Sequence, residues 1–424
     1  MKYTVQRGTK DILPNEIGVW QIIEKTCRKL FELYNYKEIR TPIFEATELF
    51  SRSIGSTTDI VSKEMYTFPD RKGRSLTLRP EETAPVVRAS IQNNLLSKNN
   101  TTKLYYLGPM FRYERPQAGR QRQFHQAGIE VFGSDDPLVD VEVILLAEQI
   151  GNRLGLSDLG IDINSVGDKQ CRPEYIKSLK DYFKDKIKEM CGECGKRFEF
   201  NPLRILDCKE PNCQKYIEKA PASSQTLCLD CKIHFEKVIE GLKASGIKYK
   251  INNRLVRGLD YYTRTTFEVI SKQLGAQNAV CGGGRYDTLV EELGGGPIPA
   301  MGFAIGLERI VEIVKSQTLP AGRQVPMTKS QQGIKLYIVT LGEEAQKIGF
   351  DLLTKARKAG ISSDMDYLGK GLSAQLKAAD RQKAKYSLII GEEEIKKNKY
   401  ILRDMKSASQ TEVSPDEVIQ TFQK

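Results

Sequence analysis

Apolar side chains recur every three or four positions between residues 15 and 35, so this stretch predicts an amphipathic helix. The apolar positions are Ile17, Trp20, Ile23, Cys27, Phe31 and Tyr34. Residues 36–45 then predict a short strand that Pro42 interrupts, because proline has no N–H to donate to a neighbouring strand. Such a strand suits a sheet edge or an interface.

Two longer strands and a helix follow. Apolar and polar residues alternate over residues 104–114 and 122–133, which predicts two antiparallel strands. Asp136 and Pro137 are typical of a helix start, and the helical pattern continues to about Leu154.

The character of the chain changes between residues 167 and 250, where lysine and cysteine become frequent. Helical patterns there cover residues 173–190 and 231–244, and we interpret the whole segment as an insertion. Strand patterns return over residues 254–271. Two glycine-rich turns follow, CGGGRYD and LGGGP, and residues 300–315 predict a strand that continues into a helix.

The C-terminal part forms a separate unit in this interpretation. Residues 319–332 are rich in Pro, Gly, Ser and Gln, which is typical of a linker. Strand and helix patterns alternate over residues 333–424 and predict a small α/β domain. A chain of 424 residues is too long for one compact core, so two or three domains are expected.

Composition narrows the class of protein. Charged residues make up 28% and hydrophobic residues 40% of the chain, as in an ordinary globular protein rather than a disordered one. The net charge of +11 favours a polyanionic partner such as nucleic acid, although basicity alone is a weak signal. The N-terminus lacks the apolar core of a signal peptide, and no apolar run is long enough to span a bilayer. We therefore expect a cytoplasmic protein that does not bind membranes.

Nine cysteines in that setting argue against a disulfide scaffold. Two CxxC pairs, CGEC and CLDC, are a signature of zinc, and the preferred hypothesis is one structural site. Its ligands would be Cys191, Cys194, Cys228 and Cys231. Cys208 or Cys213 could replace one of them, and reduced cysteines without metal are the alternative. We expect His234 at the surface and Cys27 and Cys281 in the core.

The stretch FRYERPQAGRQRQFHQAGIEVFG, residues 111–133, combines the predicted strands with many cations. The arginines are Arg112, Arg115, Arg120 and Arg122. The planar fork of arginine suits phosphate oxygens better than the point charge of lysine. A solvated hairpin with a charged tip and a pocket for a polyanion both agree with this pattern.

Several motifs make the second interpretation more specific. The same stretch resembles motif 2 of the class II aminoacyl-tRNA synthetases, in the form found in histidyl-tRNA synthetases. YKEIRTPIFE resembles motif 1, GFAIGLERIV resembles motif 3, and LTLRPEETA resembles the amino-acid-binding segment. LVRGLDYYTRTTFEV and GGGRYD resemble the two histidine-specific signatures. The resemblance covers nearly the whole chain, with the motifs in the family's order.

The resemblance implies roles for individual residues. Arg112 would hold the α-phosphate of ATP and the substrate carboxylate, and Glu114 would lie near the adenine. Arg120 would face the outer phosphates and Arg309 the γ-phosphate, with Mg²⁺ bridging those phosphates. Arg257 matches the distinctive catalytic cation of the family. Of these residues, we expect Arg112, Arg257 and Arg309 to be catalytic.

The remaining matches form a histidine site. Those implied to bind the α-amino group are Glu81, Thr83 and Gln126. Those implied to recognise the imidazole are Glu130 and Tyr262, with Tyr261 and Tyr286 nearby. A carboxylate and a phenol can address the two ring nitrogens in distinct ways, so an amino acid without them would leave Glu130 unpaired. His125 is expected to be a supporting residue rather than a base.

The resemblance implies an α+β fold: an antiparallel sheet flanked by helices, with a Cys-rich insertion and a C-terminal α/β anticodon-binding domain. The core would comprise residues 1–166 and 251–318. The implied activity is that of a histidine–tRNA ligase, which activates L-histidine with ATP and transfers it to tRNA(His). Motif 1 would lie at a homodimer interface. The alternatives are a non-catalytic regulatory relative from histidine biosynthesis and a zinc-dependent nucleic-acid-binding protein.

Two features need a structural test. Glu82 stands where the family usually has glycine, so its side chain must point away from the substrate or the local backbone path must differ. Gly282, Gly283 and Gly284 are interpreted as backbone clearance beside the substrate. A phosphate cradle is a weaker interpretation, because the sequence lacks GxxxxGK[ST].

Overall fold

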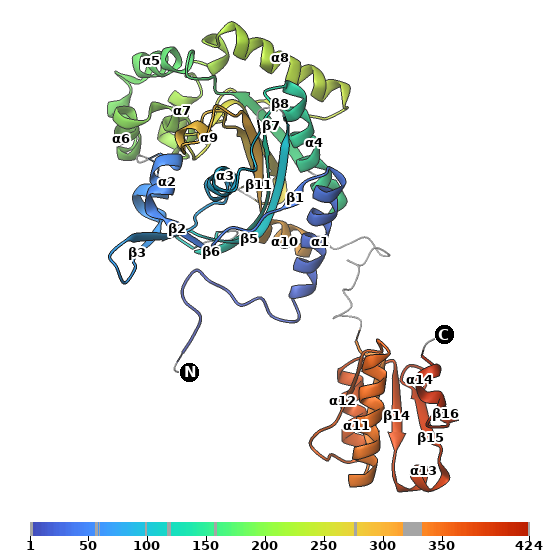
Figure 1. Cartoon of the computed structure of the whole chain (residues 1–424). Coiled ribbons are helices and arrows are strands. Elements are labelled where there is room, and N and C mark those ends of the chain that lie inside the picture. The colour runs from blue at the N-terminus through green and yellow to red at the C-terminus, as the bar shows by residue number, and fades with distance from the viewer. Residues whose placement is uncertain are drawn as a thin grey trace. The chain divides into compact units, whose positions relative to one another are not determined.

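A computed structural model describes residues 3–55, 58, 60–97, 100–116, 120–156, 159–274, 278–316 and 333–422. The chain divides into two compact units, Met1–Pro320 and Ala321–Lys424 (Figure 1). Each unit has its own sheet and its own hydrophobic core. Among the described residues, no helix combines the length and the hydropathy that a membrane span requires.

The first unit is built on an eight-stranded sheet in the order β1-β5-β6-β11-β10-β9-β7-β8. Its strands are β1 (Lys37–Glu38), β5 (Thr102–Phe111), β6 (Gln123–Phe132), β7 (Leu159–Ser165), β8 (Lys250–Ile251), β9 (Thr263–Ser271), β10 (Ala279–Arg285) and β11 (Ala300–Gly306). The six central strands pair antiparallel, while β1 and β8 add parallel edges. The predicted antiparallel sheet with flanking helices is therefore confirmed.

Side-chain alternation on β5 and β6 gives this sheet two different faces. Tyr105 packs against Phe31 of α1 (Ile17–Leu33), with ring centroids 5.1 Å apart. Tyr106, its neighbour, faces the opposite side and lines a cavity. The helices α4 (Pro137–Arg153) and α10 (Leu307–Ser316) pack beside α1. As predicted, α4 starts at Asp136, whose carboxylate accepts the Leu138 N–H at 2.8 Å, with Pro137 in the first turn.

Smaller elements close the cavity side. A three-stranded sheet has the order β2-β4-β3, and short helices pack near it. These elements are β2 (Phe44–Ala46), β3 (Tyr66–Pro69), β4 (Ser75–Leu78), α2 (Thr47–Ile54), a π-helical turn (Ile60–Glu64), α3 (Thr83–Gln92) and α9 (Leu289–Glu292). The interrupted strand predicted around Pro42 is thus two short strands, β1 and β2, on either side of the proline.

Two local predictions are wrong. CGGGRYD is not a turn, because its glycines belong to β10, between β9 and β11 in the middle of the sheet. A Cβ at Gly283 would lie 2.7 Å from a ring carbon of Phe267, so close packing rather than chain reversal requires glycine here. The strand predicted over residues 254–271 begins only at Thr263, and the preceding segment is irregular.

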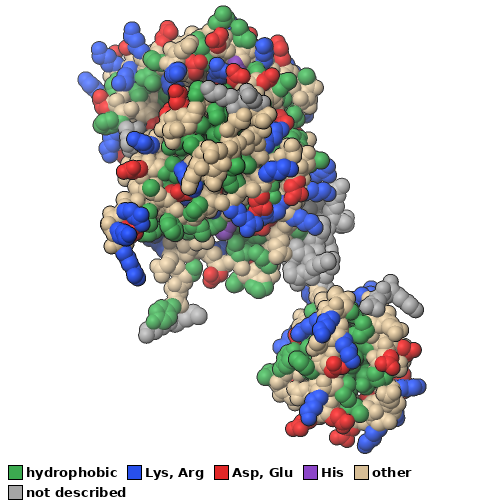
Figure 2. Space-filling model, viewed as in Figure 1, with side chains coloured by type: hydrophobic (Ala, Val, Ile, Leu, Met, Phe, Trp, Pro, Cys, Tyr) green, Lys and Arg blue, Asp and Glu red, His purple; other side chains and the backbone are tan. Residues whose placement is uncertain are grey.

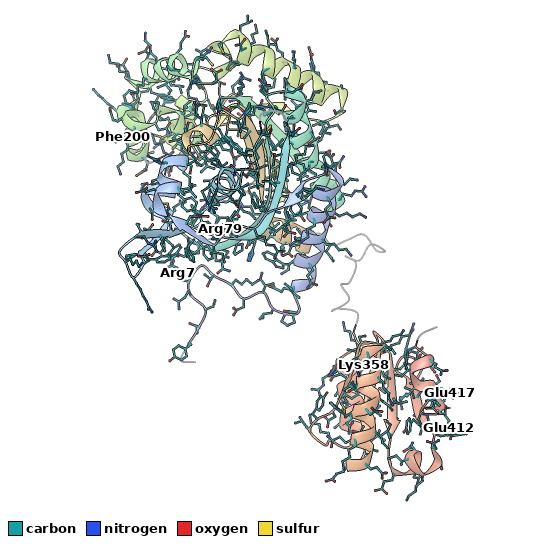
Figure 3. All side chains as sticks on the ribbon, viewed as in Figure 1. Arg7, Arg79, Phe200, Lys358, Glu412 and Glu417 are labelled. Atoms are coloured by element: carbon teal, nitrogen blue, oxygen red, sulfur yellow. The ribbon has the colours of Figure 1, made fainter. Side chains whose placement is uncertain are left out.

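Residues 167–250 form a mainly helical layer, drawn in green at the top of Figure 1. Its helices are α5 (Arg172–Phe183), α6 (Gly192–Phe200), α7 (Pro211–Ile217) and α8 (Leu229–Ala244). Three 3₁₀ turns connect them: Ile187–Glu189, Pro202–Asp207 and Ser223–Gln225. Phe200, at the end of α6, points outward and is 73% exposed (Figure 3).

The predicted surface position of His234 is also wrong. His234 lies on α8 with 5% exposure, and its Nε2 is 2.8 Å from a carboxylate oxygen of Asp140 on α4. The other Asp140 oxygen accepts from Nε of the fully buried Arg285 at 2.7 Å. A buried carboxylate and arginine need such partners, and a histidine on the facing helix provides one of them.

The second unit has the α/β order expected from its sequence. Its sheet order is β13-β12-β14-β15-β16, parallel between β13, β12 and β14 and antiparallel from there to β16. The strands are β12 (Leu336–Thr340), β13 (Ser363–Met365), β14 (Tyr386–Ile390), β15 (Tyr400–Asp404) and β16 (Gln410–Val413). The helices are α11 (Glu343–Lys358), α12 (Leu372–Arg381), α13 (Glu392–Lys397) and α14 (Glu417–Gln420).

Candidate active site

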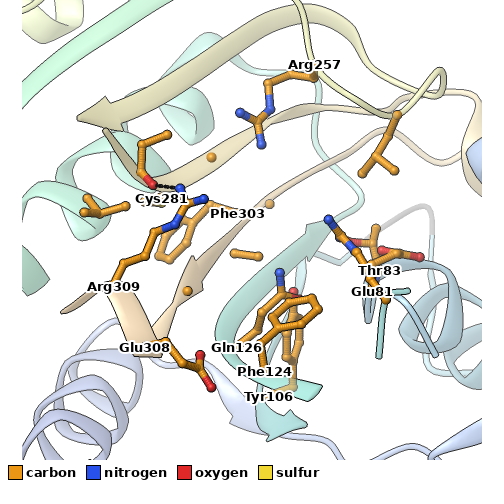
Figure 4. A pocket seen from close by; sticks show the side chains of 18 of the residues that line it. Glu81, Thr83, Tyr106, Phe124, Gln126, Arg257, Cys281, Phe303, Glu308 and Arg309 are labelled. Carbon is orange, nitrogen blue, oxygen red and sulfur yellow. Dashed lines mark hydrogen bonds between the residues drawn. The ribbon is translucent and has the colours of Figure 1, made fainter. Parts of the chain in front are cut away.

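A cavity of about 210 Å³ lies on the face of the large sheet opposite α1. Its wall includes all twelve site residues expected from the sequence. They are Glu81, Thr83, Arg112, Glu114, Arg120, Gln126, Glu130, Arg257, Tyr261, Tyr262, Tyr286 and Arg309. Figure 4 shows Gln126 of β6, Arg257 of the loop before β9 and Arg309 of α10 entering it from separate elements. Segments far apart in the sequence therefore build one cavity.

Glu130 is the most enclosed acid of this cavity, with 1% exposure. It accepts a hydrogen bond from the Thr83 hydroxyl at 2.7 Å and another from the Tyr286 hydroxyl. Burial raises the pKa of Glu130 well above its ordinary value, although both hydrogen bonds oppose the rise. This buried environment therefore favours a protonated carboxyl at this position.

Glu81 is fixed by the start of α3. Its carboxylate accepts the backbone N–H groups of Thr83 at 2.7 Å and Ala84 at 3.0 Å, which have no partner inside the helix. Burial raises the pKa of Glu81, and these N–H groups counteract the rise. Because Thr83 also donates to Glu130, the start of α3 holds both acids.

Gln126 offers an unsatisfied polar atom. Its Oε1 is buried and has no hydrogen-bond partner among the described residues, a costly arrangement unless a ligand donates to it. Phe124 lies two positions earlier on β6 and therefore on the same face. Phe124 and Tyr106 also line the cavity, and neither was predicted, although strand alternation places Phe124 on the same face as Gln126.

Aromatic rings form one wall. The ring centroids of Tyr261 and Tyr262 are 4.9 Å apart, and those of Tyr261 and Tyr286 are 5.6 Å apart. All three tyrosines are almost fully buried. Burial raises the pKa of each, so their hydroxyls remain protonated and able to donate.

Arginines approach from the other end. Arg112 donates from Nε to the Pro80 carbonyl at 2.8 Å, and its guanidinium lies 5.2 Å from the Phe124 ring centroid. Glu114 is 3.3 Å from Arg120 and 3.9 Å from Arg112. The Glu114 carboxylate thus lies near both guanidinium groups, and its negative charge offsets the repulsion between them.

Arg257 is held against the sheet. Burial opposes its charge, but the ion pair with Glu268 on β9 raises the pKa of Arg257 above its ordinary value. A Cβ at Gly282 would collide with the guanidinium, so the missing side chain at this β10 position makes room for Arg257. Arg257 takes up the room at Gly282, so clearance for the substrate at these glycines stays a prediction.

Arg309 lies at the start of α10 and donates to the Ala279 carbonyl (Figure 4). Burial lowers the pKa of Arg309, and the positive charge of Arg120 lowers it further. The preceding residue, Glu308, accepts from the His125 backbone N–H at 2.9 Å and contacts the His125 ring at 3.0 Å. His125 thus ties β6 to α10, in agreement with its expected supporting position.

A wider hollow of about 870 Å³ adjoins the cavity and shares its arginines Arg112, Arg120, Arg257 and Arg309. The insertion contributes further cations to its wall: Lys196, Arg197, Arg204 and Lys209. Over the face in Figure 2, basic and acidic side chains are interspersed. Cations shared by a cavity and a hollow suit a polyanion better than a small neutral ligand.

The Glu82 side chain points away from the cavity, which was one of the two ways in which a glutamate could replace the usual glycine. Its carboxylate accepts from the Thr41 hydroxyl at 2.8 Å and from Arg79 at 2.9 Å, and it is 1% exposed. Arg79, labelled in Figure 3, is itself buried with 5% exposure. The backbone of Glu82 has a negative φ of −110°, so a side chain is accommodated without strain.

The predicted zinc ligand set is wrong in its grouping. Cys191 and Cys194 lie with Cys208 and Cys213, while Cys228 and Cys231 lie with Cys171 and Asp168. The two CxxC pairs start different helices, α6 and α8, and so contribute to separate clusters. Cys208 and Cys213 were predicted as replacement ligands, whereas no motif indicated Asp168 or Cys171. Cys27 and Cys281 are buried, as expected.

Comparison with known proteins agrees with this architecture. The family described as histidyl-tRNA synthetase matches residues 8–169 and 212–310, and the anticodon binding domain family matches residues 335–424. A histidine–tRNA ligase of Desulfitobacterium hafniense is 52% identical over 407 residues, covering 96% of this chain and 94% of that protein. One of Halothermothrix orenii is 49% identical over 424 residues, covering both chains completely.

A solved structure extends the agreement to three dimensions. The crystal structure of apo S. aureus histidyl-tRNA synthetase superposes with a TM-score of 0.82 at 37% identity, covering 100% of both chains. The antiparallel sheet with its flanking helices is that of a class II aminoacyl-tRNA synthetase. Within that class, the chain belongs to the histidyl-tRNA synthetase family.

Proposed function

We propose that this protein is a histidine–tRNA ligase that first joins L-histidine to the α-phosphate of ATP and then transfers histidine to tRNA(His). The observation that carries the proposal is one cavity with tyrosines and buried acids at one end and Arg112, Arg120 and Arg309 at the other. Relatives with this activity match the chain over nearly their full length, including its anticodon-binding domain. The regulatory alternative is therefore not favoured.

In this mechanism, the acids and tyrosines orient histidine. Glu81, Thr83 and Gln126 would receive its α-amino group, because two acceptor groups and a hydroxyl converge there. Glu130 and Tyr262 would address the ring nitrogens. Since burial favours the protonated form of Glu130, this acid could donate to an unprotonated ring nitrogen.

The arginines address the charge of the reaction. The histidine carboxylate attacks the α-phosphorus, the bond from that phosphorus to the bridging oxygen breaks, and pyrophosphate leaves. Arg112 and Arg257 would offset the repulsion between carboxylate and phosphate, while Arg120 and Arg309 would hold the outer phosphates. Fixed cations at such a position contribute about 10²–10³ in rate for each group.

Mg²⁺ would enter with the phosphates of ATP. Among the described residues, the groups of three or more potential metal ligands lie in the cysteine clusters and not in this cavity. Mg²⁺ commonly binds through substrate phosphates and one or two carboxylates, and Glu114 and Glu308 provide carboxylates in the wall. When bound, it would neutralise charge on the outer phosphates.

The remaining parts of the proposal concern partners. The second unit would bind the anticodon, motif 1 around Pro42 would form a homodimer interface, and the protein would act in the cytoplasm. The insertion would carry structural zinc. Over residues 333–424 Lys and Arg outnumber Asp and Glu by only 16 to 13, so the charge of this domain is a weak argument for tRNA binding.

Pyrophosphate exchange into ATP without tRNA tests the activation step, with histidine compared with a panel of other amino acids. We expect exchange with histidine alone. Folded protein that binds histidine but supports no exchange would contradict the ligase assignment and favour the regulatory alternative. Exchange with another amino acid would contradict the assigned specificity.

A further inference from the structure

We propose that the insertion binds two zinc ions, one at Cys191, Cys194, Cys208 and Cys213 and one at Asp168, Cys171, Cys228 and Cys231, and that both sites hold the loop of Arg257 and Tyr262. In each cluster the four candidate ligand atoms lie within 4.8 Å of one another. All nine cysteines of the chain are reduced in the structure. Seven of them are thus gathered in two compact groups without a covalent bond between them.

The first cluster has the geometry of a tetrahedral thiolate site. The sulfurs of Cys191 and Cys208 are 3.8 Å apart, close to the separation of about 3.8 Å that follows from zinc–sulfur bonds of about 2.3 Å. Cys194 and Cys213 are fully buried. Cys213 also accepts the Cys191 backbone N–H at 3.2 Å, as thiolate ligands do in such sites.

The second cluster replaces one sulfur by a carboxylate. Asp168 Oδ1 is 3.5 Å from the Cys171 sulfur, and both Asp168 oxygens are 3.9 Å from the Cys228 sulfur. The Asp168 carboxylate is oriented by the Gln170 N–H at 2.9 Å. Zinc accepts carboxylate oxygen beside thiolates, so three cysteines and one aspartate form a complete set.

Helix starts support negative charge at both clusters. Cys191, Cys171 and Cys228 are the residues that precede the first turns of α6, α5 and α8. Free N–H groups and the helix dipole at such positions lower the energy of a thiolate, which is the form that binds metal. The helix starts favour thiolate at these positions whatever the distances between the ligand atoms.

The helices around the first cluster are short, which gives a physical reason why a bound metal would be needed to stabilise them. The first cluster joins α6, of 9 residues, a 3₁₀ turn of 6 residues, and α7, of 7 residues. Helices this short are marginal without tertiary support. Residues 170–211 also fall between the two segments that match the synthetase family, so this part needs its own means of stabilisation.

Each cluster adjoins an arginine that reaches the catalytic loop. Arg172, next to Cys171, donates to the Tyr262 carbonyl, and Arg204, four residues before Cys208, donates to the Arg257 carbonyl at 3.1 Å. Asn201 adds a hydrogen bond to Asp260 at 2.8 Å. The two metal sites would therefore position both ends of this loop. The catalytic importance of the loop rests on the proposed function, whereas the metal sites do not.

Metal analysis of the purified full-length protein tests the two sites. We expect inductively coupled plasma mass spectrometry to find about two zinc ions per chain, since each cluster offers four ligands. Cys194→Ser and Cys231→Ser should each lose one ion, and the double variant should lose both. Cys27→Ser, at a buried cysteine outside both clusters, is the control and should keep two.

The outcomes separate this proposal from the proposed function, because metal content is measured without any substrate. Less than about 0.1 zinc per chain after growth with zinc would overturn both sites. Loss of both ions in either single variant would overturn their independence, and iron in place of zinc would overturn the choice of metal.

A second measurement covers variants that fail to fold. In the unaltered protein, Co²⁺ exchanged for the bound metal should give thiolate-to-cobalt charge-transfer bands for two tetrahedral sites. Octahedral cobalt spectra, or disulfides found by peptide mapping under non-reducing conditions, would contradict the thiolate sites.

Discussion

Arg257 lies between Glu268, which pairs with its guanidinium, and Gly282, which leaves room for it. The bare backbone of Gly282 lets the guanidinium lie against β10. If this cation offsets charge during activation, Arg257→Ala should reduce histidine-dependent pyrophosphate exchange by about 10²–10³-fold. The loss should appear mainly in kcat, because the cation acts where charge develops.

Arg254→Ala is the matched control for this change. Arg254 is an exposed arginine three positions earlier and donates to the Glu218 carbonyl at 2.9 Å, outside the cavity. Its variant should retain full exchange activity. An Arg257→Ala protein within about tenfold of the original rate would remove Arg257 from the catalytic cations.

Glu82 gives a pH-dependent prediction. Burial raises the pKa of Glu82 from 4.5 to about 8, although Arg79 opposes the rise. Since the folded state favours the protonated acid, its contribution to stability is complete below about pH 4.5 and is lost as pH rises through about 8. Glu82→Gln imitates the protonated form, so its Tm relative to the unaltered protein should increase between about pH 6 and about pH 9.

Calorimetric unfolding of both proteins across this pH range measures the difference. Glu291→Gln, at an exposed glutamate on α9, should show no such trend. A relative Tm for Glu82→Gln that falls as pH rises would mean that Arg79 keeps Glu82 ionised in the folded protein.

At the scale of elements, the structure makes the insertion part of the catalytic site. Arg204 of the 3₁₀ turn Pro202–Asp207 donates to the carbonyl of Arg257. Arg204→Ala keeps the Arg257 side chain in the protein but removes a hydrogen bond that positions its loop. Exchange should therefore fall by about ten- to a hundredfold. Lys219→Ala, at an exposed cation of the same insertion that lines neither the cavity nor the hollow, should have no effect on exchange. Equal rates for the two variants would contradict a coupling through Arg204.

The elements also show what the sequence could and could not predict. The pattern located α1, α4 and the β5–β6 hairpin, because their apolar periodicity is regular and local. It misplaced β10, since glycine suggests a turn unless the flanking strands are known to leave no room for a side chain.

Motifs indicated the residues that line the cavity, whereas no pattern indicated the long-range contacts that hold the helices together. Asp140 and His234 are 94 positions apart, and no local pattern indicates that α4 and α8 pack together. The cysteine grouping failed for the same reason. CxxC spacing identifies a pair of ligands, but only the tertiary fold decides which pair completes each cluster.

For the whole molecule, two units with separate cores predict separable activities. The second unit has its own buried cluster, formed by residues of β12, β14 and α11. A chain that ends at Ser316 should keep histidine-dependent pyrophosphate exchange within about threefold, because the cavity residues all precede that position. Transfer of histidine to tRNA should fall by about 10²-fold, because one of two tRNA-binding modules is lost.

Exchange and aminoacylation assays on the same preparation distinguish the two effects. The full-length chain with Lys358→Ala, a single surface change on α11, serves as a mild control. Equal loss of both activities in the shortened chain would mean that the second unit supports the activation site itself.

The protonation of Glu130 has a consequence for how substrates are distinguished. Burial between Thr83 and Tyr286 raises the pKa of Glu130 and so favours its neutral form, from which a ligand could take the proton. A ring nitrogen that readily accepts that proton would leave an imidazolium beside a carboxylate, and a weakly basic ring of the same shape would not. Discrimination among histidine analogues should therefore follow the basicity of the heterocycle as well as its outline.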